Sequence, residues 1–253
     1  GAQATLARVY WMKGDLDSAR IYADKVIRSN KFRFASKTSL NTFMQKTVSM
    51  EETIWGLYNA EVYSDWLTQH VRRQGLGDLT TDFKSIYAYE GPTGKKDYRL
   101  DNWFGTYNRS GTPVDILVKV MGNVSDTTSL TTSYNGGPYL GTSMIRIPEM
   151  YYIMSEALLA TGNAEGAMEY LDAVVDARGM EKFADRTPLV DITLSDIMAE
   201  RRKEFIGEGQ WWFCLKRLNS PVKLSGATGA TIPGSDKIYV LPLPVEEEDY
   251  RPE

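Results

Sequence analysis

Three glutamates in the last quarter of the chain have the spacing of a chemical site. Glu200, Glu204 and Glu208 recur every four residues, so a helix would place them on one face. Glycosidases need two carboxyl groups that flank the scissile bond. The same stretch carries three cations at positions 201–203. Ion pairing between these acids and cations at the end of the helix is therefore the simpler hypothesis, and it outweighs catalysis.

A second candidate site is aromatic. Sugar rings present apolar C–H faces that stack on flat aromatic side chains, and sugar hydroxyl groups need fixed donors and acceptors. The middle of the chain offers both kinds of side chain. The candidate ligand-binding residues are Tyr63, Trp66, Tyr89, Asn102, Trp103, Tyr107, Asn108 and Arg109. We favour the run from Trp103 to Arg109, although any one of these aromatic side chains could equally belong to the core.

Metal chemistry has little support in the sequence. Asp97 and Asp101, near Asn102, offer the oxygen ligands that Ca²⁺ prefers, but their spacing does not match a calcium-binding loop. A solvated turn is the simpler interpretation. The single histidine, His70, and the single cysteine, Cys214, exclude multi-histidine sites, Cys/His zinc sites and an internal disulfide. We predict no metal site, no cofactor and no catalytic residue.

Two helical hairpins must position these candidates. Gly14 in the first hairpin corresponds to Gly162 in the second, and Ala19 corresponds to Ala167, in both cases 148 positions later. The glycine permits the tight helix exit, and the alanine lets the two helices approach closely. This pattern resembles the middle of a tetratricopeptide repeat. A tandem solenoid repeats every few tens of residues, so we expect the hairpins to pack against each other or against further helices.

The segment between the hairpins has a different composition. Residues 31–143 contain most of the Gly, Ser, Thr and Asn, with short β-prone runs at Thr53–Tyr58 and Val114–Met121. A loop-rich insert on a helical scaffold is where binding residues are expected. We therefore divide the chain into a hairpin (1–30), a candidate ligand-binding insert (31–143), and a second hairpin with a further helix and an extended tail (144–253).

The sequence predicts a further helix that begins after Thr193 and has a recognisable N-terminal cap. Thr193 can cap the helix while Asp196 lies three positions on, which is a capping-box arrangement. The aromatic run Trp211–Phe213 follows this helix, and we interpret it as packing rather than as a sugar platform. The tail Leu241–Pro244 alternates leucine with proline and is expected to be extended.

Composition excludes several classes of function. The chain of 253 residues has 29 Lys and Arg against 33 Asp and Glu, a net charge of −4, so a nucleic-acid ligand is not expected. No apolar run reaches the roughly 18 residues of a membrane-spanning helix. The chain enters an amphipathic run directly after Gly1, and we expect that an upstream part has been removed.

One segment resembles a known family. Residues 199–213, AERRKEFIGEGQWWF, followed by Leu215–Arg217, resemble the signature of the SusD/RagB family of bacterial outer-membrane nutrient-binding lipoproteins. Cys214 stands where the family usually has an acidic residue, and Arg251 precedes Pro252 where it usually has asparagine. Four further segments agree in order: Leu6–Tyr10, Asp97–Leu100, Ile145–Glu149 leading into Glu156 and Ala157, and Leu241–Pro244.

The resemblance implies both a fold and a function. The fold would be mostly α, with tetratricopeptide-like hairpins, a loop-rich irregular insert, and a C-terminal subdomain containing short strands. This chain would be the C-terminal half of one SusD-like unit. The N-terminal half and its lipidated cysteine would be absent, so the chain itself would have no membrane anchor.

The implied function is non-enzymatic binding of nutrient oligosaccharides at the cell outer membrane. The bound glycan would be delivered to a SusC-like TonB-dependent transporter. An alternative from a different class is a helical-repeat scaffold that binds peptide or protein ligands. A glycoside-processing enzyme is the third and most distant hypothesis.

Overall fold

A computed structural model describes most of the chain. It covers residues 1–40, 49, 51–59, 85–88, 94–109, 111–117, 119, 124–126, 131–132, 141–223 and 230–241. The chain divides into two compact units, Gly1–Glu208 and Gly209–Glu253. Each unit is described by itself below.

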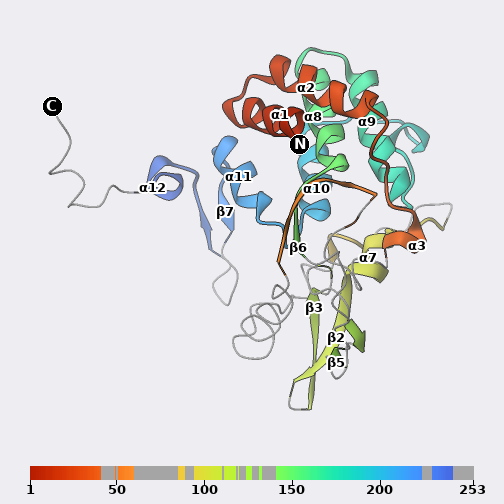
Figure 1. The fold of residues 1–253 in the computed structure, drawn as a ribbon. Coiled ribbons are helices and arrows are strands. Elements are labelled where there is room, and N and C mark those ends of the chain that lie inside the picture. Colours follow the sequence, from red (N-terminus) through yellow and green to blue (C-terminus); the bar gives the residue numbers. More distant parts are fainter. Residues whose placement is uncertain are drawn as a thin grey trace, which may run out of the picture. The chain divides into compact units, whose positions relative to one another are not determined.

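Two helical hairpins form one end of the first unit (Figure 1). The first consists of α1 (Ala2–Lys13) and α2 (Leu16–Arg28), and the second of α8 (Ile147–Ala160) and α9 (Ala164–Ala177). The two helices of each hairpin pack together, and α2 also packs against α8. The hairpins therefore pack against each other, which is one of the two arrangements expected from the sequence.

The two hairpins share their turn chemistry. Gly14 and Gly162 both have a positive φ, of 79° and 81°, which side-chain-bearing residues rarely adopt. One residue later, Asp15 and Asn163 cap α2 and α9 by accepting a hydrogen bond from the backbone N–H three residues on. Ala19 and Ala167 are fully buried, in keeping with the close helix approach predicted for them.

A two-stranded antiparallel sheet leads into the second hairpin. Strand β1 (Thr53–Tyr58) has the bounds predicted from the sequence, and it pairs with β6 (Gly141–Arg146). Strand β6 continues directly into α8, with Pro148 in the first helical turn, where its missing N–H costs nothing. The sheet thus ties the insert to the helical scaffold.

The middle of the chain builds a small core of its own. Among the described residues of this region, the helices are α3 (Lys37–Leu40) and α7 (Tyr98–Trp103). Strands β2 (Phe104–Arg109) and β3 (Thr112–Leu117) form a hairpin directly after α7, and β4 (Val124–Asp126) pairs with β5 (Thr131–Thr132). The buried residues of this core are Ala35, Leu40, Tyr87, Trp103, Phe104 and Leu117.

Helix α10 (Leu194–Glu204) carries the first part, residues 199–204, of the segment that resembles the SusD/RagB signature. The predicted capping box is present: the Thr193 side chain accepts from the Asp196 N–H, and the Asp196 carboxylate accepts from the Thr193 N–H. A short 3₁₀ turn, η2 (Phe183–Asp185), precedes the helix. Helix α10 packs against α8, so this first part of the signature segment belongs to the helical scaffold.

The second unit contains α11 (Gln210–Arg217), β7 (Val222–Lys223), β8 (Thr231–Ile232) and α12 (Asp236–Tyr239). The Trp212 ring contacts the Tyr239 ring at 5.1 Å between centroids. Trp212 and Phe213 are nevertheless 44% and 53% exposed, so the structure does not bury these two rings as core packing would. Helical hairpins, an irregular insert and short C-terminal strands together confirm the predicted mostly α fold class.

Candidate ligand-binding site

Asn102 and Trp103 lie inside the protein. The Trp103 side chain is 0% exposed and faces the Lys119 ammonium, which lies 4.0 Å from the ring centroid. Asn102 is 5% exposed, and its Nδ2 donates to the Tyr98 carbonyl at 2.5 Å. A ring stacks on a sugar only through an accessible face. The predicted platform at Trp103 is therefore corrected: this ring belongs to the buried core of the insert, together with Leu40 and Leu117.

Three other predicted residues lie on the β2–β3 hairpin. Tyr107, Asn108 and Arg109 are consecutive residues of β2. Asn108 is exposed, and its Oδ1 accepts a hydrogen bond from the Gly111 N–H at 2.8 Å, which stabilises the turn. A ligand role for these three residues stays a prediction. Tyr63, Trp66 and Tyr89 lie outside the described residues.

The glutamates with helical spacing belong to a buried group of charges, called the ionic cluster below. Most of their partners come from distant elements rather than from the same helix. Among the residues that the structure describes, the cluster consists of five carboxylates and five cations: Glu52, Asp97, Glu200, Glu204, Glu208, Arg99, Lys119, Arg146, Arg178 and Lys203. The formal charges of these ten residues balance.

Glu204 is at the centre of the cluster. Its Oε1 accepts from Arg146 Nη1 at 2.7 Å and from Arg178 Nη2 at 2.8 Å, and its Oε2 accepts from Arg99 Nη1 at 3.3 Å. Arg146 ends β6, Arg178 caps the C-terminus of α9, and Arg99 is the second residue of α7. The pairing within one helix that the sequence suggested is present between Glu200 and Lys203. For Glu204 the structure replaces it with long-range pairs.

The electrostatics of Glu204 oppose acid catalysis. Burial alone would raise the pKa of this carboxyl group, but the charges of Arg178, Arg146 and Arg99 outweigh burial and hold the pKa well below its usual range. A glycosidase acid needs the opposite, a raised pKa that keeps its proton near neutral pH. Glu204 is thus a structural anion.

Lys119 links the ionic cluster to the core of the insert. Its Nζ donates to the Glu204 carbonyl at 2.7 Å and to Glu208 Oε1 at 2.6 Å, and it lies over the Trp103 ring. Burial lowers the pKa of Lys119 to about 8, although the Glu208 carboxylate favours the charged form. The cluster therefore fixes α7 and the start of the β2–β3 hairpin relative to α10.

The acids considered for calcium binding do not converge. Asp97 is 1% exposed and pairs with Arg99 at 2.8 Å, so the expectation of a solvated turn is wrong for this residue. Its carboxylate also caps α7 by accepting from the Arg99 N–H. Asp101 is exposed on the same helix. Within the described residues, no group of three or more His, Cys, Asp or Glu side chains could hold a metal ion.

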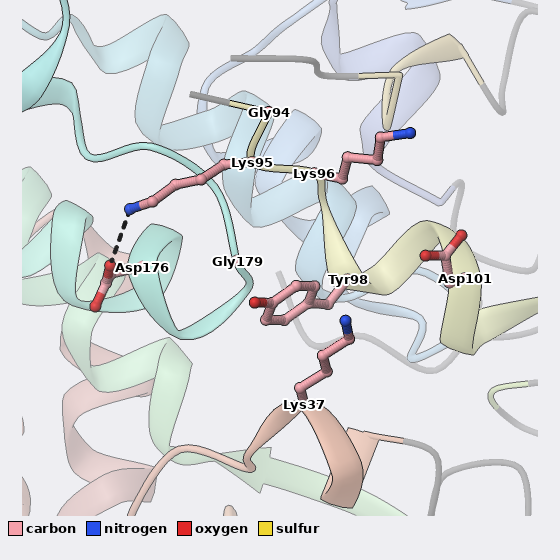
Figure 2. A pocket seen from close by; sticks show the side chains of 8 residues that line it. All are labelled: Lys37, Gly94, Lys95, Lys96, Tyr98, Asp101, Asp176 and Gly179. Atoms are coloured by element: carbon pink, nitrogen blue, oxygen red, sulfur yellow. Dashed lines mark ion pairs between the residues drawn. The ribbon is translucent and has the colours of Figure 1, made fainter. Parts of the chain in front are cut away.

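A pocket of about 430 Å³, called the Tyr98 pocket below, lies beside α7. Pockets that hold small ligands measure about 300–1,000 Å³. Lys37 enters from α3, and Lys95 and Lys96 come from the segment before α7; Figure 2 shows Lys95 and Lys96 leaving that segment in different directions. The full lining is Lys37, Gly94, Lys95, Lys96, Tyr98, Asp101, Asp176 and Gly179.

One wall of this pocket is held rigidly. The Tyr98 N–H donates to the Arg178 carbonyl at 2.8 Å. Gly179 has a φ of +82°, and a Cβ at this position would lie 2.4 Å from Tyr98 Cε1. Only glycine allows the backbone to approach the ring this closely. The Lys37 ammonium lies 4.7 Å from the centroid of the same ring.

The sequence did not reveal this pocket, because its residues come from segments far apart in the chain. Lys37 and Asp176 have no local pattern that relates them to Tyr98. The one usable signal was the segment Asp97–Leu100, which the family resemblance had marked. Two of the pocket's neighbours, Asn102 and Trp103, were predicted as ligand contacts, but the accessible side of α7 carries Tyr98 and Asp101 instead.

Comparison with known proteins supports the resemblance seen in the sequence. The family model of the SusD family matches residues 120–231. This region includes β6, the second hairpin, α10 and α11. No curated protein matches the chain.

Solved structures share the fold across almost the whole chain. A SusD superfamily protein from Bacteroides thetaiotaomicron has a TM-score of 0.71 and 24% identity, and the match covers 98% of this chain and 58% of that one. A SusD-like carbohydrate binding protein from Bacteroides vulgatus has a TM-score of 0.67 and 18% identity, covering 97% and 56%. A SusD superfamily protein from Parabacteroides distasonis has a TM-score of 0.64 and 15% identity, covering 98% and 60%. The predicted resemblance to the SusD/RagB family is confirmed over residues 120–231, and the fold that it implies is shared with these structures. The chain spans little more than half the length of these structures.

Proposed function

We propose that this chain functions in ligand capture, because it has the SusD fold and matches the model of the SusD family over residues 120–231. The protein binds nutrient oligosaccharides and does not cleave them. One observation carries this proposal: the fold is shared, over 97% of this chain, with a structure named a SusD-like carbohydrate binding protein.

The chemistry of the glutamates supports binding rather than hydrolysis. Glu200, Glu204 and Glu208 are the carboxylates whose spacing first suggested a glycosidase, and all three are engaged by cations in the ionic cluster. Hydrolysis needs one accessible carboxylic acid and a second accessible carboxylate. These three glutamates provide neither.

The delivery step and the location are part of the same proposal. The captured oligosaccharide passes to a SusC-like TonB-dependent transporter at the outer surface of the outer membrane, where a lipid anchor holds the protein. None of the helices in the described part of the chain is long and apolar enough to cross a membrane. Support for the transporter comes from the family relationship alone.

Isothermal titration of the full chain against a panel of neutral and acidic oligosaccharides tests glycan binding. We expect heat from binding of at least one glycan, with the glycan recovered intact by mass spectrometry. Shortened products would overturn the non-enzymatic role. Binding of unstructured peptides with no glycan binding would favour the helical-repeat scaffold that binds peptide or protein ligands.

Fractionation of the native bacterium tests the location and the partner. We expect the protein in the outer-membrane fraction, degraded by protease added to intact cells, and co-purified with a TonB-dependent transporter after detergent extraction. Recovery in the cytosolic fraction only, or protection from external protease, would contradict the proposed location.

A further inference from the structure

A second pocket, called the Phe32 pocket below, lies where α2 ends. Its volume is about 410 Å³, which is the size of pockets that hold small ligands. The described residues of its lining are Asn30, Lys31, Phe32, Arg33 and Glu51. Four of them come shortly after the end of α2, and Glu51 comes from the segment before β1. This lining combines an aromatic ring with an amide, a carboxylate and two cations.

Two hydrogen bonds hold the two segments of this pocket together. The Arg33 N–H donates to the Glu51 carbonyl at 3.1 Å, and the Ala35 N–H donates to Glu52 Oε1 at 2.7 Å. Glu52 belongs to the ionic cluster, where its buried carboxylate pairs with two arginines. The pocket is therefore preformed, because its walls are anchored to the buried scaffold, and a ligand does not have to order these segments.

Phe32 and Phe34 lie two residues apart and have different surroundings. The Phe34 ring contacts the Tyr151 ring at 4.7 Å between centroids, so Phe34 belongs to the packing against α8. Phe32 is half-buried and lines the pocket, and in the described part of the chain its ring contacts neither another aromatic ring nor a cation. The Phe32 ring thus offers an apolar surface to the C–H face of a sugar.

The charged groups of the pocket supply a donor and an acceptor side by side. Arg33 Nη2 and Glu51 Oε1 form an ion pair at 3.0 Å, and the Arg33 side chain is 80% exposed, so the pair contributes little to stability. Glu51 Oε2 is shielded from water and has no hydrogen-bond partner among the described residues, which is unfavourable for an acceptor. The whole side chain is 26% exposed, and a terminal carboxylate turns readily about its last bond, so a ligand hydroxyl can reach this oxygen.

Asn30 adds an amide that folding does not use. Its backbone is left-handed, with a φ of 53°, a conformation that glycine and asparagine adopt most readily. The Asn30 side chain is exposed and, within the part of the chain that the structure describes, forms no hydrogen bond. The amide can therefore donate to a ligand and accept from it.

We propose that the Phe32 pocket binds a neutral hexopyranose residue of a glycan, with one C–H face of the sugar against the Phe32 ring. The sugar hydroxyl groups pair with the Asn30 amide, the Arg33 guanidinium and the Glu51 carboxylate. Because Arg33 and Glu51 already neutralise each other, an uncharged ligand can engage both without separating them. This inference rests on the proposed glycan-binding function and specifies where the glycan binds and which kind of sugar the site takes.

Titration calorimetry of the full chain with neutral trisaccharides of glucose, galactose and mannose tests the inference. We expect at least one of them to bind, with an affinity that changes little with added salt, because the ligand is uncharged. Phe32→Leu keeps an apolar side chain and removes the flat ring, so it is expected to weaken binding about threefold to tenfold. Phe213→Leu is the control, because Phe213 is 53% exposed and does not line this pocket.

A matched pair of asparagine variants tests the amide without disturbing the backbone. Asn30→Gly removes the amide and keeps the left-handed φ, so it is expected to fold and to weaken trisaccharide binding about twofold to tenfold. Asn219→Gly is the control, because Asn219 also has a positive φ, of 47°, and does not line this pocket. Its affinity is expected to equal that of the unmodified chain, and thermal melts verify that both variants are folded.

The outcomes separate this inference from the proposed function. If a trisaccharide binds and Phe32→Leu has no more effect than Phe213→Leu, or Asn30→Gly no more than Asn219→Gly, the site is overturned while the glycan-binding function stands. Binding of acidic glycans alone would likewise overturn the neutral-sugar site and leave the function in place. Absence of binding to every glycan tested would overturn both.

Discussion

The ionic cluster and the Tyr98 pocket both gather acidic and basic side chains, but the two regions differ in how far these side chains are buried. In the cluster, five carboxylates and five cations are held out of water, and the Glu204 carboxylate and the Arg146 and Arg178 side chains are 0% exposed. In the pocket, the lysine and aspartate side chains remain exposed to water. Burial with matched charge makes a rigid support, whereas exposed charged groups remain accessible to a ligand.

The two regions are joined by α7. Arg99 enters the ionic cluster from one side of this helix, and Tyr98 and Asp101 line the pocket on another. The helix has only six residues, so an isolated peptide of this length would not be helical. The buried ion pairs of Arg99 therefore help to hold the pocket wall in place. This comparison predicts large stability effects in the cluster and small ones in the pocket.

The largest effect is expected for Glu204→Gln. The variant leaves the buried cluster one carboxylate short, because Arg146 and Arg178 keep Glu52 but lose Glu204. Breaking such a buried pair costs about 3–5 kcal/mol of unfolding free energy. Chemical denaturation measures this loss, with the exposed Glu169→Gln as the matched control. A loss below about 1 kcal/mol would show that the cluster is not the support described here.

Trp103→Ala is expected to have a comparable but slightly smaller effect. Removing the buried ring leaves a cavity in the insert core and costs about 3–5 kcal/mol. Trp55→Ala is the control because Trp55 is 43% exposed, and its unfolding free energy should change by about 0.5 kcal/mol or less. If Trp103→Ala instead kept its stability and lost glycan affinity, the ring would be a ligand contact.

Lys119, a member of the ionic cluster, is expected to make the unfolding free energy depend on pH. Its pKa is about 8 in the folded chain against an ordinary value of 10.5, so the folded state binds fewer protons than the unfolded state between these values. The contribution of Lys119 to the unfolding free energy therefore rises with pH between its folded and unfolded pKa values. Lys119→Met removes this rise, and thermal melts from pH 8 to 10 measure it. An unchanged pH slope in the variant would contradict the assignment, and Lys13→Met on the surface serves as control.

The smallest effect is expected for Lys95→Gln in the pocket. The pair with Asp176 is long and about half exposed, so its loss should change the unfolding free energy by about 0.5 kcal/mol or less. Chemical denaturation beside Glu204→Gln gives the direct comparison. A loss as large as that of Glu204→Gln would place the pocket lysines in the structural support and would remove the distinction between the two regions.

Local elements were predictable from the sequence. The positive φ of Gly14 and Gly162, the capping box at Thr193 and the bounds of β1 all follow from interactions within a few residues. The burial of Trp103 was not predictable, because it depends on Lys119 and Leu40, which lie elsewhere in the chain. The partners of Glu204 were missed for the same reason, since Arg99 and Arg146 are 105 and 58 positions away.

The sequence alone therefore determined the helical hairpins, their turns and caps, and the family relationship, because these depend on short-range periodicity and on residue order. Tertiary structure decided which charges are buried and matched and which remain hydrated, since desolvation depends on what packs around each group. Glu204 and Asp101 are both acids with nearby cations in the sequence. Only the fold made one of them a buried support and the other part of an open pocket.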